Sequence, residues 1–258
     1  MTEFEIVVDE YMLDCTAKGL AKQTMKSYEQ TLKLFAQYLF EAFEIDNPKD
    51  VKAEHLKAYM RNLEERGKYK NTAAHLSKNF PERRGDYGKK ISNTTIANYV
   101  RNIKAFYSHL HSERIIRRNP MTAVKSVKPE RKQKIMLEDN ELKQFFRAFD
   151  VTKFDQYRDW MVARLLFDTG SRISELLAIV PADIDLRGNA ILLRETKNKK
   201  QRFVYFSDKT RRNLKSWLDY KERYSDSDYV FPTLHGNRLN LCLVERSFAI
   251  GRRMSACR

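Results

Sequence analysis

The chain has 258 residues, enough for two modest domains, and 42% of them are hydrophobic. That share supports packed cores and excludes an intrinsically disordered chain. Lysine and arginine total 49 against 34 acidic residues, which gives a formal net charge of +15. An excess of this size indicates a polyanionic partner, with nucleic acid first and an acidic membrane surface second. A basic protein without such a partner is the plain alternative.

The sequence carries no signal for a membrane span or for secretion. No apolar run approaches the ~20 residues that a bilayer-spanning helix needs. The acidic residues Glu3 and Asp9 interrupt the apolar start, so it lacks the pattern of a signal peptide. The three cysteines, Cys15, Cys242 and Cys257, are far apart and fit neither a disulfide framework nor a zinc site. We therefore expect a cytoplasmic protein with no membrane partner.

The first part of the chain shows helical periodicity. Apolar residues recur at helical spacing in four segments, which lie before Gly19, from Thr24, over 51–63 and from Ser92. These segments predict a small four-helix domain over residues 1–118.

Two features of this domain favour contact with nucleic acid. Residues 68–90 are basic, contain glycine and proline and show no clear period, which predicts a long loop. That loop is interpreted either as disordered or DNA-tracking, or as a solvated spacer. The fourth helix carries Arg101, Asn102 and Lys104 outside its apolar stripe. Such a basic face either is merely solvated or contacts phosphates.

A basic linker and a second domain follow. The composition of residues 119–136 predicts an extended strap between domains, and the second domain covers 137–258. Within it, residues 190–194 and 202–206 alternate as two strands joined by a lysine-rich tip, among several apolar helices. The predicted fold class is therefore mainly α with a small β-sheet.

The stretch from Phe167 to Ile179 organises the second domain. An apolar helix ends at a Thr-Gly break, and Ser171 is a plausible N-cap for the helix that follows. Arg172 then lies in the first turn, beside the positive end of the helix dipole, which disfavours a cation. A phosphate would compensate, because backbone N–H groups and a planar guanidinium converge on it. An ordinary surface arginine beside a helix cap is the alternative interpretation.

The string Asp-Thr-Gly-Ser-Arg-Ile-Ser-Glu-Leu-Leu-Ala-Ile at 168–179 resembles the first-arginine motif of the tyrosine recombinases, the phage-integrase and Xer-like family. The fourth helix with Phe106 and Tyr107, followed by Asn119-Pro120, is similar to that family's SAM-like core-binding domain. The resemblance implies site-specific strand cleavage and rejoining of duplex DNA through a 3′-phosphotyrosine, without a metal or a cofactor. It also implies other recombinase protomers as partners on the DNA.

The resemblance assigns roles to individual residues. Arg172 would hold the non-bridging oxygens of the scissile phosphate, with Glu175 as a supporting residue that orients the site. Lys197 lies in a tip similar to the family's Gly-Lys-Gly-Asn-Lys-Glu-Arg turn, and would protonate the leaving 5′ oxygen. The neighbouring basic residues are interpreted as phosphate contacts: Lys199, Lys200 and Arg202. A solvated hairpin that only touches the DNA backbone is the alternative.

The family's second catalytic box and nucleophilic tyrosine are not found where they are expected. His235 and Arg238 have the His-x-x-Arg letters but lie at a turn, so they are weak candidates. The last tyrosine, Tyr229, precedes both. We therefore expect a catalytic domain that is truncated before the second box, and a chain that is inactive alone. One alternative is an inactive DNA-binding module, which occupies recombination sites or is a decayed remnant of a mobile element. The other is a basic helical protein that binds RNA or membranes.

Overall fold

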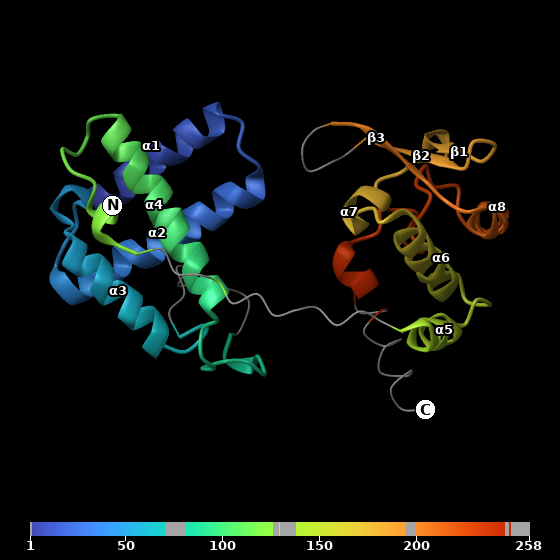
Figure 1. The fold of residues 1–258 in the computed structure, drawn as a ribbon, viewed down its shortest axis with the longest axis horizontal. Coiled ribbons are helices and arrows are strands. Elements are labelled where there is room, and N and C mark those ends of the chain that lie inside the picture. Colours follow the sequence, from blue (N-terminus) through green and yellow to red (C-terminus); the bar gives the residue numbers. More distant parts are fainter. Residues whose placement is uncertain are drawn as a thin grey trace. The chain divides into compact units, whose positions relative to one another are not determined.

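The computed structural model divides the chain into two compact units, residues 1–133 (unit 1) and residues 134–258 (unit 2), shown in Figure 1. It describes residues 2–70, 81–125, 129, 138–194, 200–245 and 248. Both units are mainly helical, and a small sheet lies in unit 2, so the predicted fold class is confirmed. No helix within the described ranges is long and apolar enough to cross a bilayer.

Unit 1 contains the four predicted helices. They are α1 (Glu3–Ala17), α2 (Lys22–Phe43), α3 (Ala53–Glu65) and α4 (Asn93–Ser112). Polar caps begin two of them, because a side-chain oxygen satisfies a backbone N–H that has no partner within the helix. Thr2 accepts from the N–H of Glu5 in α1, and Ser92 accepts from the N–H of Thr95 in α4.

Aromatic side chains from all four helices meet in the core of unit 1. The ring of Phe4 in α1 lies 6.0 Å from that of Phe35 in α2 and 5.9 Å from that of Phe106 in α4. Tyr59 of α3 joins through Phe35, at 4.9 Å between ring centroids. All four side chains are fully buried, and burying each one stabilises the unit by about 1.5–3 kcal/mol. The helical spacing of the apolar residues therefore points them into one core.

One polar side chain of α4 departs from the sequence-based expectation. Asn102, which we expected on an outer face, is only 4% exposed. Its Nδ2 donates to Thr31 Oγ1 at 2.9 Å, to Ser27 Oγ at 3.0 Å and to the Ser27 carbonyl at 3.2 Å, all on α2. A buried amide is costly unless it is hydrogen-bonded, so this network favours one register between α2 and α4.

The two ends of the predicted basic loop are paired with each other. Gly67 and Lys90 form an antiparallel bridge. A Cβ at Gly67 would lie 2.4 Å from the carbonyl oxygen of Gly88, so this close approach requires glycine. Residues 71–80 lie outside the described part, and both interpretations of the loop stay open.

The packing of unit 1 continues beyond residue 118. A short 3-10 helix, η3 (Pro120–Ala123), follows, and Met121 is buried in the core. The side chain of Asn119 accepts from the Met121 N–H at 2.9 Å and fixes this turn. The structure thus includes the first residues of the predicted linker in the packed unit, because Met121 supplies an apolar anchor there.

Unit 2 consists of helices packed against a three-stranded antiparallel sheet in the order β1-β2-β3. Its elements are α5 (Asp139–Arg147), α6 (Phe154–Thr169), α7 (Ile173–Leu176), β1 (Ile184–Asp185), β2 (Ala190–Leu193), β3 (Arg202–Tyr205) and α8 (Asp208–Glu222). The predicted hairpin is confirmed, with Leu193 of β2 opposite Arg202 of β3. Ile191 and Leu193 are fully buried, in the same core as Trp217 of α8.

Buried polar contacts fix the segment that follows α8. The Arg158 guanidinium pairs with Asp159 at 2.9 Å and donates to the Pro232 carbonyl at 2.9 Å. The indole N–H of Trp217 donates to the Val230 carbonyl at 3.0 Å. These bonds hold the start of the 232–238 turn against α6 and α8.

Asn102→Ala is expected to destabilise unit 1 by about 2–3 kcal/mol, because the amide bonds to α2 are lost and their acceptors stay buried. The two tryptophans, Trp160 and Trp217, both lie in unit 2, so tryptophan fluorescence reports that unit alone. In urea unfolding, the variant should shift the circular dichroism curve and leave the fluorescence curve unchanged.

Asn98→Ala is the matched control, since Asn98 is an exposed residue of the same helix. Its free energy of unfolding should change by less than about 0.5 kcal/mol. Equal effects of the two substitutions would show that the buried amide does not hold the two helices together.

Candidate functional site

The turn between α6 and α7 presents Arg172. α6 ends at Gly170, whose φ of 61° lies in the left-handed region that glycine adopts readily. Arg172 is the N-cap residue of α7, so the predicted cap at Ser171 is wrong by one residue. The Ser171 hydroxyl instead lies 2.9 Å from Thr169 Oγ1, within the turn. Both positions are polar residues before an apolar helix, which is why the sequence pattern did not separate them.

Glu175 anchors Arg172. The backbone N–H of Arg172 donates to Glu175 Oε2 at 3.2 Å, and its NH1 donates to Oε1 at 2.8 Å. The Glu175 side chain is 1% exposed, whereas that of Arg172 is 54% exposed. A carboxylate in the first turn of a helix offsets the unfavourable placement of a cation there. The guanidinium is thus tethered at one point while more than half of the side chain stays open to solvent.

A second arginine reaches the same carboxylate from the sheet. Arg202, the first residue of β3, donates from NH2 to Glu175 Oε2 at 2.8 Å and from NH1 to Oε1 at 3.2 Å. Two such parallel bonds are the bidentate geometry that suits guanidinium and carboxylate. We expected Arg202 to contact phosphate. The structure adds an intramolecular partner, and the phosphate contact stays a prediction.

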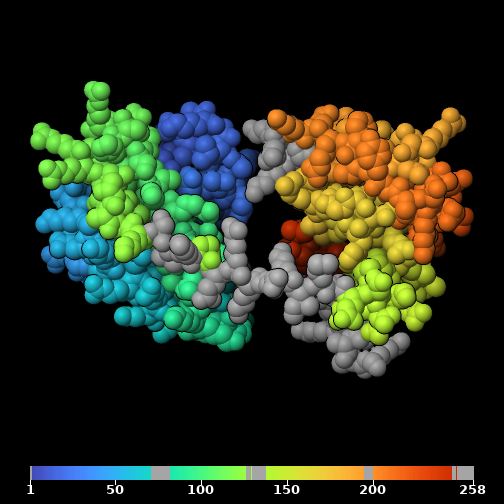
Figure 2. Space-filling view, in the orientation of Figure 1, coloured from blue at the N-terminus to red at the C-terminus, as the bar shows by residue number. Residues whose placement is uncertain are grey.

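The electrostatics of this cluster leave a net positive charge. Burial alone would raise the pKa of Glu175, but hydrogen bonds from Arg202 and Arg172 outweigh it and lower the pKa from 4.5 to about 2. One carboxylate therefore faces two guanidiniums, and the excess charge lies on the exposed arginines. In Figure 2 the yellow segment that contains α7 and the orange segment that contains β3 both lie at the surface of unit 2. The arrangement can receive an anion.

The weak candidates His235 and Arg238 lie on a tight turn closed by an antiparallel bridge between Pro232 and Arg238. Arg238 NH2 lies 3.4 Å from the carbonyl oxygen of Ser174 in α7. His235 is exposed on the turn. The structure thus brings Arg238 to the short helix that Arg172 begins, and a catalytic role for either residue stays a prediction.

Of the three lysines predicted to act at the hairpin tip, only Lys200 lies among the described residues. Lys197 and Lys199 lie outside the described residues, and Lys200 is exposed just before β3. A meeting of Arg172 and Lys197 over one phosphate therefore stays a prediction.

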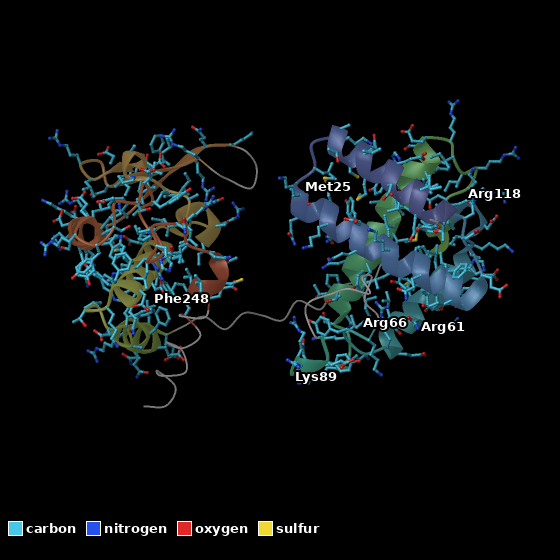
Figure 3. The ribbon with its side chains drawn as sticks, turned by 180° about the vertical axis from the view of Figure 1, so that it is seen from behind. Met25, Arg61, Arg66, Lys89, Arg118 and Phe248 are labelled. Carbon is cyan, nitrogen blue, oxygen red and sulfur yellow. The ribbon has the colours of Figure 1, made fainter. Side chains whose placement is uncertain are left out.

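A groove of about 750 Å³ lies on unit 1, between α2, the segment after α3 and the start of α4. Its cationic lining residues are Lys26, Lys33, Arg66 and Lys68. Figure 3 shows Arg66 at the end of α3, on the side of the unit where Lys89 also lies. Of the predicted DNA-binding residues, Arg101 donates to Asn98 Oδ1 at 2.7 Å, and Asn98 lines the groove. Lys104 is exposed on α4 but is not part of the lining.

Two cationic residues of α2, Lys26 and Lys33, are not among the residues that the sequence predicts to bind DNA. One face of α2 carries Lys26, the neutral Gln30 and Lys33, because residues at i, i+4 and i+7 lie on the same side of a helix. This stripe is a signal that the sequence alone contains. Arg66 and Lys68 join it only through the fold, because they come from the far end of α3.

Comparison with known families gives the context of this site. Residues 136–250 match the phage integrase family, and residues 8–78 match the SAM-like N-terminal domain of phage integrases. The first match contains the Arg172 cluster and the second contains most of the groove on unit 1. The chain belongs to the phage integrase family of tyrosine recombinases.

Curated tyrosine recombinases are similar over much of the chain. Tyrosine recombinase XerC of Bacillus subtilis (strain 168) is 29% identical over 204 residues, which cover 76% of this chain and 64% of that protein. Tyrosine recombinase XerC of Thermodesulfovibrio yellowstonii is 31% identical over 177 residues, covering 65% of this chain and 56% of that protein. The chain thus spans less than two thirds of the length of these relatives.

Solved integrases share the fold. A lambda integrase dimer (residues 75–356) bound to a COC′ core site has a TM-score of 0.71 and 15% identity, covering 99% of this chain and 79% of that chain. The Tn1549 transposon integrase in complex with circular intermediate DNA has a TM-score of 0.64 and 16% identity, covering 94% of this chain and 74% of that chain. The predicted recombinase fold is therefore confirmed.

Glu175→Gln is expected to remove an acid-sensitive part of the stability of unit 2. The folded pKa of Glu175 lies below its ordinary value of 4.5, so the carboxylate stabilises the fold above pH 4.5. That contribution, about 3 kcal/mol in order of magnitude, is lost as the pH falls towards 2. Urea unfolding followed by tryptophan fluorescence at several pH values should give a flatter pH dependence for the variant.

Glu222→Gln is the control, because Glu222 is an exposed carboxylate of α8 in the same unit. It should leave both the stability and its pH dependence unchanged within about 0.5 kcal/mol. An unaltered acid dependence in Glu175→Gln would contradict the assignment of this carboxylate.

Proposed function

We propose that this chain binds duplex DNA as part of a cytoplasmic tyrosine recombinase, in which Arg172 holds a backbone phosphate. The reaction is site-specific strand cleavage and rejoining through a 3′-phosphotyrosine. The observation that carries the proposal is the exposed guanidinium of Arg172, tethered to the buried carboxylate of Glu175. A surface arginine without a ligand would gain little from so rigid an anchor.

The chemistry of phosphoryl transfer explains why this arrangement is useful. Negative charge develops on the non-bridging oxygens in the transition state, and a preorganised guanidinium stabilises it without reorganising. A planar fork of N–H donors also matches phosphate geometry better than an ammonium group does. The predicted general acid is Lys197, which would protonate the leaving 5′ oxygen.

Unit 1 supports the same function by supplying affinity. The groove combines Lys26, Lys33, Arg66 and Lys68 with hydroxyl and amide side chains and with one carboxylate, Glu29, which pairs with Lys33 at 2.6 Å. Such a lining suits the sugar–phosphate backbone, where lysine and arginine neutralise phosphates and polar groups fix the register. Arg101 lies beside the groove through its bond to Asn98, which favours a phosphate contact over a purely solvated face.

Other protomers are proposed partners on the DNA. The lambda integrase structures are described as a dimer bound to a core site and as a tetramer bound to a Holliday junction. Two or more copies of this chain would assemble on DNA in a similar way.

An inactive DNA-binding module is the second candidate function. The observation that favours it is the groove on unit 1, whose lysine and arginine side chains can contact phosphates without any catalytic residue. A module of this kind would occupy recombination sites without cutting them.

Lys26→Gln tests the groove. Fluorescence-anisotropy titrations with duplex DNA across a salt series should give weaker binding and a salt slope that is smaller by about 1, because one phosphate contact is lost. Lys57→Gln is the control, since Lys57 is exposed on α3 outside the groove lining, and it should leave the slope unchanged. Equal or tighter binding of the wild-type chain to RNA or to anionic vesicles would contradict the DNA assignment.

A suicide DNA substrate tests the catalytic capacity of the 258 residues. We expect no covalent protein–DNA adduct after denaturing electrophoresis, because within the described residues the Arg172 side chain contacts Glu175 and no tyrosine. A full-length family recombinase on its own substrate is the positive control. A trapped adduct that disappears in Arg172→Ala would refute this expectation and would assign the reaction to the chain itself.

A further inference from the structure

Two arginine side chains, those of Arg172 and Arg202, donate hydrogen bonds to the Glu175 carboxylate, and they do so with different geometries. Arg202 occupies both oxygens, with bonds of 2.8 and 3.2 Å. The Arg172 guanidinium makes a single bond, from NH1 to Oε1 at 2.8 Å. Among the described residues, the other donors of the Arg172 guanidinium bond to no protein group. The Arg202 guanidinium therefore makes two hydrogen bonds to Glu175, whereas the Arg172 guanidinium makes one.

We propose that Arg202 is a positioning residue, which occupies Glu175 in a bidentate pair and so leaves the remaining donors of Arg172 for a phosphate. The inference rests on the proposed function and gives Arg202 a role in that same site. It differs from a direct phosphate contact by Arg202, because Arg202 acts through the carboxylate and not on the DNA.

The physical reason is competition for one buried acceptor. A lone arginine beside a buried carboxylate takes both oxygens, since two parallel bonds are stronger than one. Without Arg202, Arg172 would turn its fork onto Glu175, and the pair would carry no net charge. With Arg202 present, the three groups keep one positive charge, and more than half of the Arg172 side chain stays exposed. Phosphate attraction therefore depends on an arginine that need not touch the phosphate.

The same pair ties two elements together. Arg202 begins β3 and lies opposite Leu193 of β2, so its side chain joins the base of the hairpin to α7. Glu175 is 27 positions away in sequence, which makes this a tertiary contact. The strand that follows the lysine-rich tip is thus held to the helix that begins at Arg172.

A double-mutant cycle on DNA affinity tests the proposal. Arg202→Lys keeps the charge but cannot form the bidentate pair, and it should weaken duplex binding about fivefold in the wild-type background. In the Arg172→Lys background the same change should weaken binding less than about twofold, because the residue it positions is absent. Additive losses, with a salt slope smaller by about 1 for Arg202→Gln, would overturn the proposal in favour of a direct phosphate contact.

Arg194→Lys is the matched control. Arg194 is an exposed arginine at the end of β2 that also pairs with a buried carboxylate, that of Asp183. It should change the stability of unit 2 as Arg202→Lys does, but not the DNA affinity. A comparable loss of DNA affinity in Arg194→Lys would show that the Arg202–Glu175 ion pair only stabilises the fold and does not position Arg172. Urea curves by tryptophan fluorescence verify that each variant is folded under the binding conditions.

A measurement without DNA separates this proposal from the proposed function. In ¹⁵N-labelled protein, the Nε–Hε resonance of Arg172 should shift in Arg202→Lys, because Arg172 takes over the second carboxylate oxygen. In the Glu175→Gln background, Arg202→Lys should produce no further shift. An unchanged Arg172 resonance would overturn the positioning role even if the chain binds DNA. Conversely, a wild-type chain that does not bind duplex DNA would end the proposed function, whatever this resonance does.

Discussion

A buried carboxylate shared between two arginines organises the candidate site. Removing Glu175 from water is costly, and the cost is met only because Arg172 and Arg202 supply four hydrogen bonds to its two oxygens. The two apolar residues that follow Glu175 are Leu176, the last residue of α7, and Leu177, its C-cap; both belong to the core of unit 2, which keeps the carboxylate in place. The position and orientation of the exposed Arg172 guanidinium thus depend on the packing of the unit 2 core beneath Glu175.

Unit 1 also has a buried polar side chain that is hydrogen-bonded between two elements, but its groups are neutral. The Asn102 amide is buried between α2 and α4, where its hydrogen bonds to Ser27 and Thr31 favour a single packing of the two helices. The cationic lining of the groove lies around this network. In both units a satisfied polar group between two elements supports cations that face outward. Such preorganisation limits the conformational entropy that binding a polyanion would otherwise cost.

The sequence predicts the elements better than it predicts the contacts between them. Helical periodicity and strand alternation identify the four helices of unit 1 and the hairpin of unit 2, because those signals come from burial along one element. Asn102 interrupts no apolar pattern, so its burial emerges only when α2 lies across from it. Arg202 looks like one more basic residue of the hairpin, since its partner is 27 positions away. The cap at Arg172 was missed by one residue because two polar residues precede the helix. Lys197 lies outside the described residues, and its role stays a prediction.

The most direct test of the shared carboxylate is to follow both arginine side chains while DNA is added. In ¹⁵N-labelled protein titrated with duplex DNA, the account predicts that the Nε–Hε resonance of Arg172 shifts and gains protection from exchange. That of Arg202 should stay near its free position, because its guanidinium remains on Glu175. A large shift of Arg202 with an unmoved Arg172 would contradict the account, since the phosphate would then be held by the other arginine.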